Sequence, residues 1–151
     1  YSKGIIEKYS YPGADGKEVA PIELTFGNGE VETKYANGKV SRQFTMKGGE
    51  FDGSYKIFDD KGNLYREFNE EIASTNGIET TYFTNGKPKI EMNYFYGSKH
   101  GVTTYYYTNG KVKKTENYVY GDQEGETKYF DKTGVLTQTE VWFKGILYEV
   151  K

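Results

Sequence analysis

Residues 101–124 read GVTTYYYTNGKVKKTENYVYGDQE, and this arrangement of 24 residues recurs along most of the chain. Its first glycine belongs to a series at constant spacing: Gly29, Gly53, Gly77, Gly101 and Gly125. A second glycine follows each of these nine residues later, which gives Gly38, Gly62, Gly86, Gly110 and Gly134. Self-similarity at a fixed period of this size indicates one supersecondary unit that is stacked many times.

Each repeat has the signature of a β-hairpin. Asn37-Gly38, Asn85-Gly86 and Asn109-Gly110 predict two-residue type I′ loops. At the equivalent place, residues 59–62 and 131–134 read DDKG and DKTG, which predict longer turns ending in a left-handed glycine. The other ends of the hairpins turn near Gly49, Gly97, Gly121 and Gly145. Between the turns, Thr, Tyr, Val, Phe and Ile occur at strand density without a helical apolar stripe.

These hairpins predict an all-β fold, an open and curved single-sheet antiparallel meander built from tandem 24-residue repeats. The chain is then one repeat domain over residues 1–151. Its repeats run over 29–52, 53–76, 77–100, 101–124 and 125–148. Residues 4–28 echo the pattern weakly, and we expect them to form a degenerate unit that caps the stack.

The composition argues against several classes of function. Twenty basic and 22 acidic residues give a net charge of -2, which leaves no overall basic footprint for nucleic acid or an anionic membrane. The chain has no cysteine, which excludes disulfides and thiolate sites. No apolar run approaches the ~18 residues that a membrane span needs. The chain shows no signal peptide, but a start at Tyr1 instead of Met is compatible with a processed, exported form, so the localisation stays open.

An even period places equivalent residues of every repeat on the same side of a sheet. That side collects most of the tyrosines of the later repeats, and such rings contribute strongly to protein interfaces. We therefore predict a binding strip of Tyr94, Tyr96, Tyr105, Tyr107, Tyr118, Tyr120, Tyr129 and Trp142. The alternative is that these rings form only the internal core of a curled sheet. The opposite side is polar except for one aromatic row, Phe58, Tyr82, Tyr106 and Phe130.

The segment from Tyr94 to Gly101, YFYGSKHG, is followed by YYYTNGK at residues 105–111. Together they resemble the bacterial variant of the MORN repeat, and residues 118–130 resemble it again. The resemblance implies an open antiparallel meander that serves as an interaction scaffold. Some bacterial members carry the name of YwqK-type antitoxins, and eukaryotic relatives are linked to membranes. Fold alone does not fix function.

Three arrangements of reactive side chains are candidates for catalysis or metal binding. His100 is the only histidine, and in the repeat that the chain resembles, a His before Gly sits at a surface turn. Asp59, Asp60 and Asn63 resemble half of a calcium loop but lack its distal bidentate Glu, which favours a hairpin turn. Glu70 and Glu71 are neighbours in a strand, so they point to opposite faces. We therefore expect no catalytic residues, no cofactor and no metal site.

The predicted function is that of a non-enzymatic scaffold for protein–protein interaction, including antitoxin-like neutralisation of a partner. The partner is another protein or a second copy of the chain. The alternative is an exported envelope protein that binds a glycan, peptidoglycan or a membrane surface. Nucleic acid is disfavoured because Glu91 and Glu116 dilute the charge of the lysines that flank the aromatic row.

Overall fold

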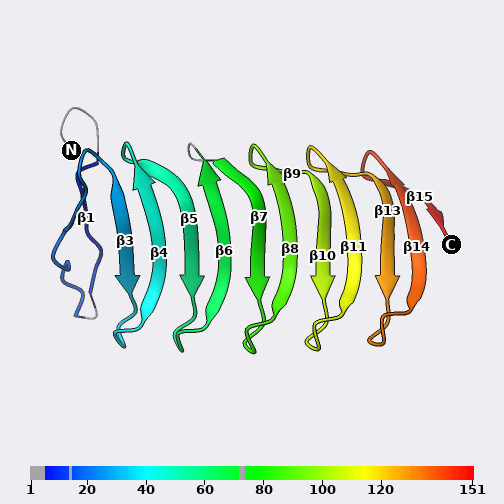
Figure 1. The fold of residues 1–151 in the computed structure, drawn as a ribbon, viewed down its shortest axis with the longest axis horizontal. Helices are drawn as coiled ribbons and strands as arrows, with labels where there is room; N and C mark the ends of the chain where they lie inside the picture. The colour runs from blue at the N-terminus through cyan, green and yellow to red at the C-terminus, as the bar shows by residue number, and fades with distance from the viewer. Residues whose placement is uncertain (1–5, 14, 72–73) are drawn as a thin grey trace. The chain divides into compact units, whose positions relative to one another are not determined.

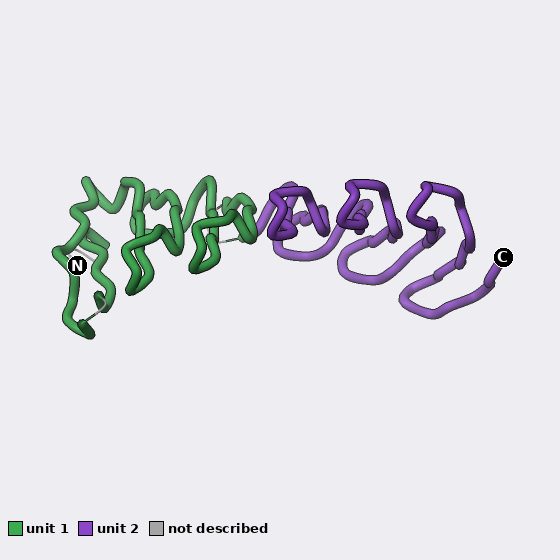
Figure 2. The backbone as a smooth tube through the Cα atoms, turned by 90° about the horizontal axis from the view of Figure 1, so that it is seen from below, with its two compact units in different colours: residues 1–74 green, residues 75–151 purple. Residues whose placement is uncertain are grey.

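The structure, a computed structural model, describes residues 6–13, 15–71 and 74–151. All the regular elements of these residues are β-strands. The chain divides into two compact units, residues 1–74 and 75–151, which Figure 2 colours green and purple. Within each unit the strands lie side by side in chain order (Figure 1). The predicted all-β antiparallel meander is therefore confirmed.

Unit 1 contains two sheets. Its larger sheet pairs β3 (Gly29–Lys34), β4 (Val40–Lys47), β5 (Glu50–Phe58) and β6 (Leu64–Glu71) in that order. The second sheet pairs β1 (Lys8–Tyr9) with β2 (Ile22–Glu23). We expected residues 4–28 to form a degenerate unit that caps the stack. In the structure, β1 and β2 of this segment form a sheet of their own, while residues 4, 5 and 14 lie outside the described residues.

The core of unit 1 lies between its two sheets. Val31 and Phe44 are paired across β3 and β4 and are almost fully buried, as are Met46 and Leu24. The ring of Tyr9 from β1 contacts that of Phe44 edge-on, with 5.4 Å between the ring centroids. The N-terminal segment therefore covers one face of β3 and β4, because rings of this size are stabilised by leaving water.

Unit 2 repeats one hairpin three times. The long strands are β7 (Ser74–Tyr82), β8 (Pro88–Phe95), β10 (Gly101–Tyr106), β11 (Val112–Val119), β13 (Gly125–Phe130) and β14 (Leu136–Phe143). They pair in chain order, and β15 (Ile146–Val150) follows β14. Two short strands extend the pairing, β9 (Ser98–Lys99) on β8 and β12 (Asp122–Gln123) on β11. Within residues 74–151, the first and last of these strands do not pair with each other, so the sheet is open.

The Asn-Gly turns differ from the predicted two-residue loops. The amide of Tyr107 donates to the carbonyl of Lys111 over 2.8 Å, so three residues form the loop, and of these only Gly110 has a positive φ, 92°. Asn109 shapes the loop, because its Oδ1 accepts from the amide of Lys111 over 2.9 Å. The turns that begin at Asp59 and Asp131 have the same backbone hydrogen bonds, so the five turns share one design.

Neighbouring turns of this kind are joined to each other. Nδ2 of Asn109 donates to the carbonyl of Lys132 over 3.1 Å, and Nζ of Lys111 donates to that of Thr133 over 2.5 Å. Asn85 and Lys87 make the same two bonds to the turn of the next repeat. The recurrent Asn-Gly-Lys thus has a physical role: it closes its own loop and bonds to the loop 24 residues later.

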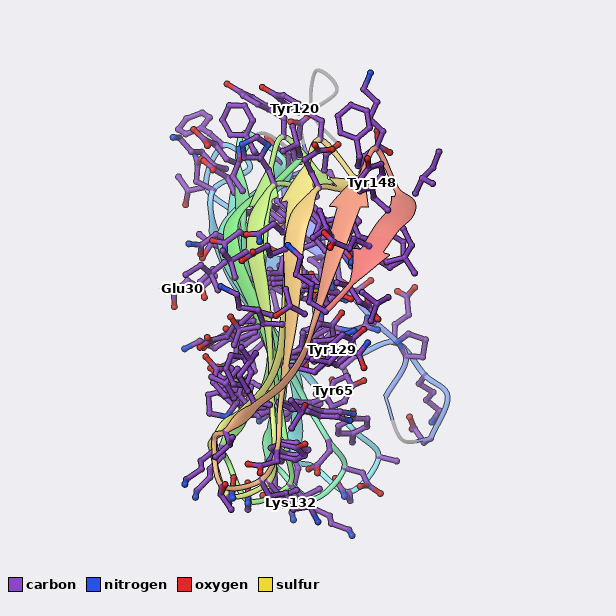
Figure 3. All side chains as sticks on the ribbon, turned by 90° about the vertical axis from the view of Figure 1, so that its right-hand side faces the viewer. Glu30, Tyr65, Tyr120, Tyr129, Lys132 and Tyr148 are labelled. Carbon is purple, nitrogen blue, oxygen red and sulfur yellow. The ribbon has the colours of Figure 1, made fainter. Side chains whose placement is uncertain are left out.

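The opposite ends of the hairpins carry the type I′ turns. Tyr96-Gly97, Tyr120-Gly121 and Lys144-Gly145 have positive φ at both residues, as a two-residue loop of this type requires. The turn positions near Gly49, Gly97, Gly121 and Gly145 are therefore confirmed. Figure 3 shows Tyr120 at one end of the strands and Lys132 at the other, with Tyr129 between them.

Candidate functional site

Five of the eight predicted site residues lie on one face of unit 2. The pairings of Gly77 with Tyr94, Gly101 with Tyr118 and Gly125 with Trp142 place three of the rings in one row across the strands. Tyr105 and Tyr129 both pair with Lys114 and form a second row. We call this surface the tyrosine face; it consists of Tyr94, Tyr105, Tyr118, Tyr129 and Trp142, all of them half-buried.

The other three predicted residues lie elsewhere. Tyr96 and Tyr120 are in the type I′ turns, where they are 73% and 66% exposed. Tyr107 begins an Asn-Gly turn, and its hydroxyl donates to the carbonyl of Phe130 over 2.8 Å. The prediction assumed that strand alternation continues as far as Tyr96 and Tyr120. In the structure, β8 and β11 each end one residue before these tyrosines, so alternation no longer sets where their side chains lie.

The tyrosine face contains a buried carboxylate, Glu116, which the sequence analysis considered only as a charge beside the lysines of the aromatic row. Glu116 accepts from the hydroxyl of Tyr105 over 2.8 Å and from that of Tyr118 over 3.0 Å. It also forms an ion pair with Lys114, with 2.7 Å between Nζ and Oε1. The same ammonium lies 4.3 Å from the centre of the Tyr105 ring, within cation–π range. The signal was present in the sequence, because Glu116 and Tyr118 are two residues apart in a strand and must share a face.

The electrostatics of this cluster follow from its partners. Burial raises the pKa of Glu116, but the hydrogen bonds and charge of Lys114 and the two phenols outweigh burial and hold the pKa below its usual value. Burial, followed by the charge of Glu116, raises the pKa of Tyr118 to about 12. Burial and the Glu116 hydrogen bond also raise the pKa of Tyr105. Both phenols are therefore neutral donors at physiological pH, and the carboxylate is ionised.

The next repeat has the same arrangement with one change. The hydroxyl of Tyr129 and Nε1 of Trp142 each donate to Oε2 of Glu140 over 3.1 Å. Gln138 takes the place of Lys114, and its Nε2 donates to Oε1 of Glu140 over 2.8 Å. The repeat therefore keeps two aromatic donors and the carboxylate but has an amide in place of the ammonium.

A small residue lies beside the carboxylate of each cluster, on the neighbouring strand. Thr103 pairs with Glu116 and Thr127 pairs with Glu140, and both threonines are almost fully buried. Each threonine is thus packed beneath larger neighbouring side chains.

The equivalent face of unit 1 is covered over β3 and β4, whereas the tyrosine face is not covered within unit 2. The N-terminal segment packs on Val31, Phe44 and Met46 and buries them almost completely. Within the described part of unit 2, the strands form one layer only, and the rings of the tyrosine face stay half-buried. Aromatic residues are enriched in protein–protein interfaces, so this surface is a candidate contact site.

A second apolar surface lies at the type I′ turns of unit 2. We call it the turn-end patch; it consists of Phe95, Tyr96, Val119, Tyr120, Phe143 and Ile146, all exposed. His100 lies under it, with its ring 4.8 Å from that of Tyr120 and its Nδ1 accepting from the amide of Tyr120 over 3.4 Å. Asn76 and Glu124 accept from the equivalent amides of Tyr96 and Lys144, which confirms the turn role predicted for His100.

The remaining candidates for chemistry form turns or strands. Oδ1 of Asp59 accepts from the amides of Lys61 and Asn63, as expected for a hairpin turn. Among the described residues, no three His, Cys, Asp or Glu side chains are grouped so that they could hold a metal ion. None of the described segments is a helix with the length and apolar character needed to cross a membrane.

Comparison with protein families matches three segments, residues 27–47, 75–95 and 99–120. Each contains one Asn-Gly turn with its two strands, β3–β4, β7–β8 and β10–β11. All three match the MORN repeat variant. The hairpins with aspartate turns, β5–β6 and β13–β14, lie outside these matches. No match was found among curated proteins. MORN repeats are in general non-catalytic scaffolds associated with protein or membrane binding.

Proposed function

We propose that this chain is a non-enzymatic scaffold that binds another protein through the tyrosine face of unit 2. The observation that carries the proposal is the contrast between two equivalent faces. In unit 1 a segment of the chain buries Val31, Phe44 and Met46, whereas in unit 2 the rings of Tyr105, Tyr118 and Tyr129 have no such cover within the unit. A partner protein would supply the missing layer, and aromatic rings with polar tips are typical anchors for it.

The charges of the face favour a protein over nucleic acid. Glu116 and Glu140 lie between the rings, where they would repel phosphates. Lys87 and Lys111, which flank the aromatic row of the other face, donate to backbone carbonyls of the next turn. The same carboxylates disfavour insertion of the tyrosine face into a lipid surface, because a buried charge needs a partner.

Antitoxin-like neutralisation is one form that this binding would take. In that case the partner is a toxic protein, and co-expression of the chain restores growth of the host. A glycan of the cell envelope would use the same stacked rings, so it is the alternative that the experiment must separate.

The test is capture from cells of the source organism with the full chain as bait. The Tyr118→Ser, Tyr129→Ser double variant should lose a stoichiometric protein that the wild type captures. A Tyr96→Ser, Tyr120→Ser variant is the matched control, because it removes two tyrosines from the turn-end patch and should keep the protein. Circular dichroism and urea unfolding verify that both variants are folded. Equal capture by the double variant, or capture of glycan alone, would contradict the proposal; self-association in sedimentation equilibrium would make the partner a second copy.

A further inference from the structure

Two successive repeats of unit 2 differ in how their central carboxylate is neutralised. In the cluster around Glu116, Lys114 supplies a cation over the ring of Tyr105. In the cluster around Glu140, the equivalent residue is Gln138, which is neutral. The hydrogen bonds of Glu140 come from Tyr129, Trp142 and Gln138, and none of these donors carries a positive charge.

The surroundings of Glu140 are apolar and accessible. Tyr129 and Trp142 flank it on its own face, and Val150 of β15 pairs with it from the other side and is exposed. The basic side chains near this part of the sheet already have partners. Lys114 pairs with Glu116 and lies 5.9 Å from the centre of the Tyr129 ring. Lys128 pairs with Glu126, and Lys151 pairs with Glu149. Residues 126, 128 and 149 belong to the opposite face by strand alternation.

We propose that Glu140, Tyr129 and Trp142 form a binding site for a basic side chain, of the lysine type, that a partner protein presents. The chain carries its own template for this complex, because the cluster 24 residues earlier already holds an ammonium between a carboxylate and an aromatic ring. A partner's ammonium would complete the cluster with a charge-assisted hydrogen bond to the carboxylate and a cation–π contact. This inference rests on the proposed function and names the chemistry that the partner brings to the tyrosine face.

The site has a specific reporter. Trp142 is the only tryptophan of the chain, and its indole N–H is bonded to Glu140, so one cross-peak in a ¹H–¹⁵N NMR spectrum reports on the carboxylate. The probe is the peptide acetyl-Gly-Lys-Gly-amide, and the same peptide with an Nε-acetylated lysine is its neutral counterpart. The lysine peptide should shift the cross-peak saturably, and the acetylated peptide should not.

Three variants make the test decisive. Glu140→Gln removes the charge and should weaken binding by about tenfold or more, as expected for loss of one charge-assisted bond. Gln138→Lys rebuilds the template cluster within the chain and should block binding to a similar extent, because its own ammonium occupies the site. Glu126→Gln is the matched control, since it changes the net charge equally on the opposite face and should bind as the wild type does.

The possible results separate this inference from the proposed function. Equal binding of both peptides, or undiminished binding to Gln138→Lys, would overturn the inference. So would a wild-type cross-peak that does not move. The proposed function would survive any of these results if the Tyr118→Ser, Tyr129→Ser variant still loses its captured protein. Loss of capture in Glu140→Gln, together with peptide binding in the wild type, would support both.

Discussion

The hydroxyl of Tyr105 donates to Oε2 of Glu116 across two neighbouring strands, over a distance of 2.8 Å. Tyr118 donates to the same oxygen from the strand of Glu116 itself, over 3.0 Å. One buried carboxylate therefore accepts hydrogen bonds from two rings, one on β10 and one on β11. Because the donors remain neutral and the acceptor is ionised, these bonds belong to the stronger, charge-assisted class.

Glu116→Ala should destabilise the protein by about 2 to 4 kcal/mol. The change leaves Lys114 partly buried without its anion and removes the acceptor of two phenols, and uncompensated buried groups are costly. Urea unfolding followed by circular dichroism measures the loss. Glu126→Ala, which breaks an exposed ion pair with Lys128, should cost much less, because solvent screens such a pair. Equal losses in the two variants would show that the cluster contributes nothing beyond a surface charge.

Acid should weaken the fold through the same residue. The pKa of Glu116 is lower in the folded protein than its usual value of 4.5, so the stability that ionisation contributes is present above pH 4.5 and is lost as the pH falls through the folded value. Urea unfolding at a series of pH values should therefore show the free energies of wild type and Glu116→Gln converging on acidification. Parallel curves would contradict the assignment.

At high pH the protein should unfold over the pH range in which the buried tyrosine hydroxyls ionise. The pKa of Tyr118 rises from 10 to about 12 on folding, so its contribution is complete below pH 10 and is lost as the pH rises toward 12. Tyrosinate absorbance should rise together with the loss of β-structure, whereas Tyr118→Phe should be less sensitive to pH in this window. Titration of all 16 tyrosines near pH 10 in a folded protein would contradict this view.

The sequence was most informative where one physical rule acted alone. The 24-residue period and strand alternation placed Tyr105, Tyr118 and Tyr129 on one face, because an even period cannot change sides. The predicted turn type at Asn-Gly was wrong, because hydrogen bonds of the asparagine side chain favour a different loop. Asn109 closes its loop through Oδ1 and bonds to the next turn through Nδ2, which overrides the type I′ preference of Asn-Gly.

The turn residues depend on contacts between residues that lie far apart in the sequence. Tyr96 and Tyr120 have positive φ, which is uncommon for residues with large side chains, and the acceptors Asn76 and His100 that lie 20 residues earlier hold their amides. Strand alternation places Glu116 on the tyrosine face, but the predicted binding strip included aromatic residues alone. The packing of β1 and β2 on one face of β3 and β4 could not be predicted, because these two strands are too short and irregular to show a pattern.

Asn109→Ala should destabilise the protein by about 1 to 2 kcal/mol, because it removes one bond within its loop and one to the following loop. Asn109→Asp keeps the acceptor and loses the donor, so its loss should be about half as large. Urea unfolding distinguishes the two, and Thr108→Ala in the same exposed loop is the control. An Asp variant as unstable as the Ala variant would show that only the bond to the next turn matters.

His100 should be replaceable by any residue with an acceptor at the same place. Its Nδ1 accepts from the amide of Tyr120, and Oδ1 of Asn76 accepts from the amide of Tyr96 over 2.8 Å in the preceding repeat. His100→Asn should therefore stay within about 0.5 kcal/mol of the wild type, whereas His100→Leu should lose about 1 kcal/mol, because the amide of a strained turn residue is left without its acceptor. Hydrogen exchange gives a local readout, since the Tyr120 amide should stay protected in the Asn variant and exchange faster in the Leu variant. If both variants lose stability equally, the ring contacts of His100 with Phe95 and Tyr120, and not its acceptor, hold the turn.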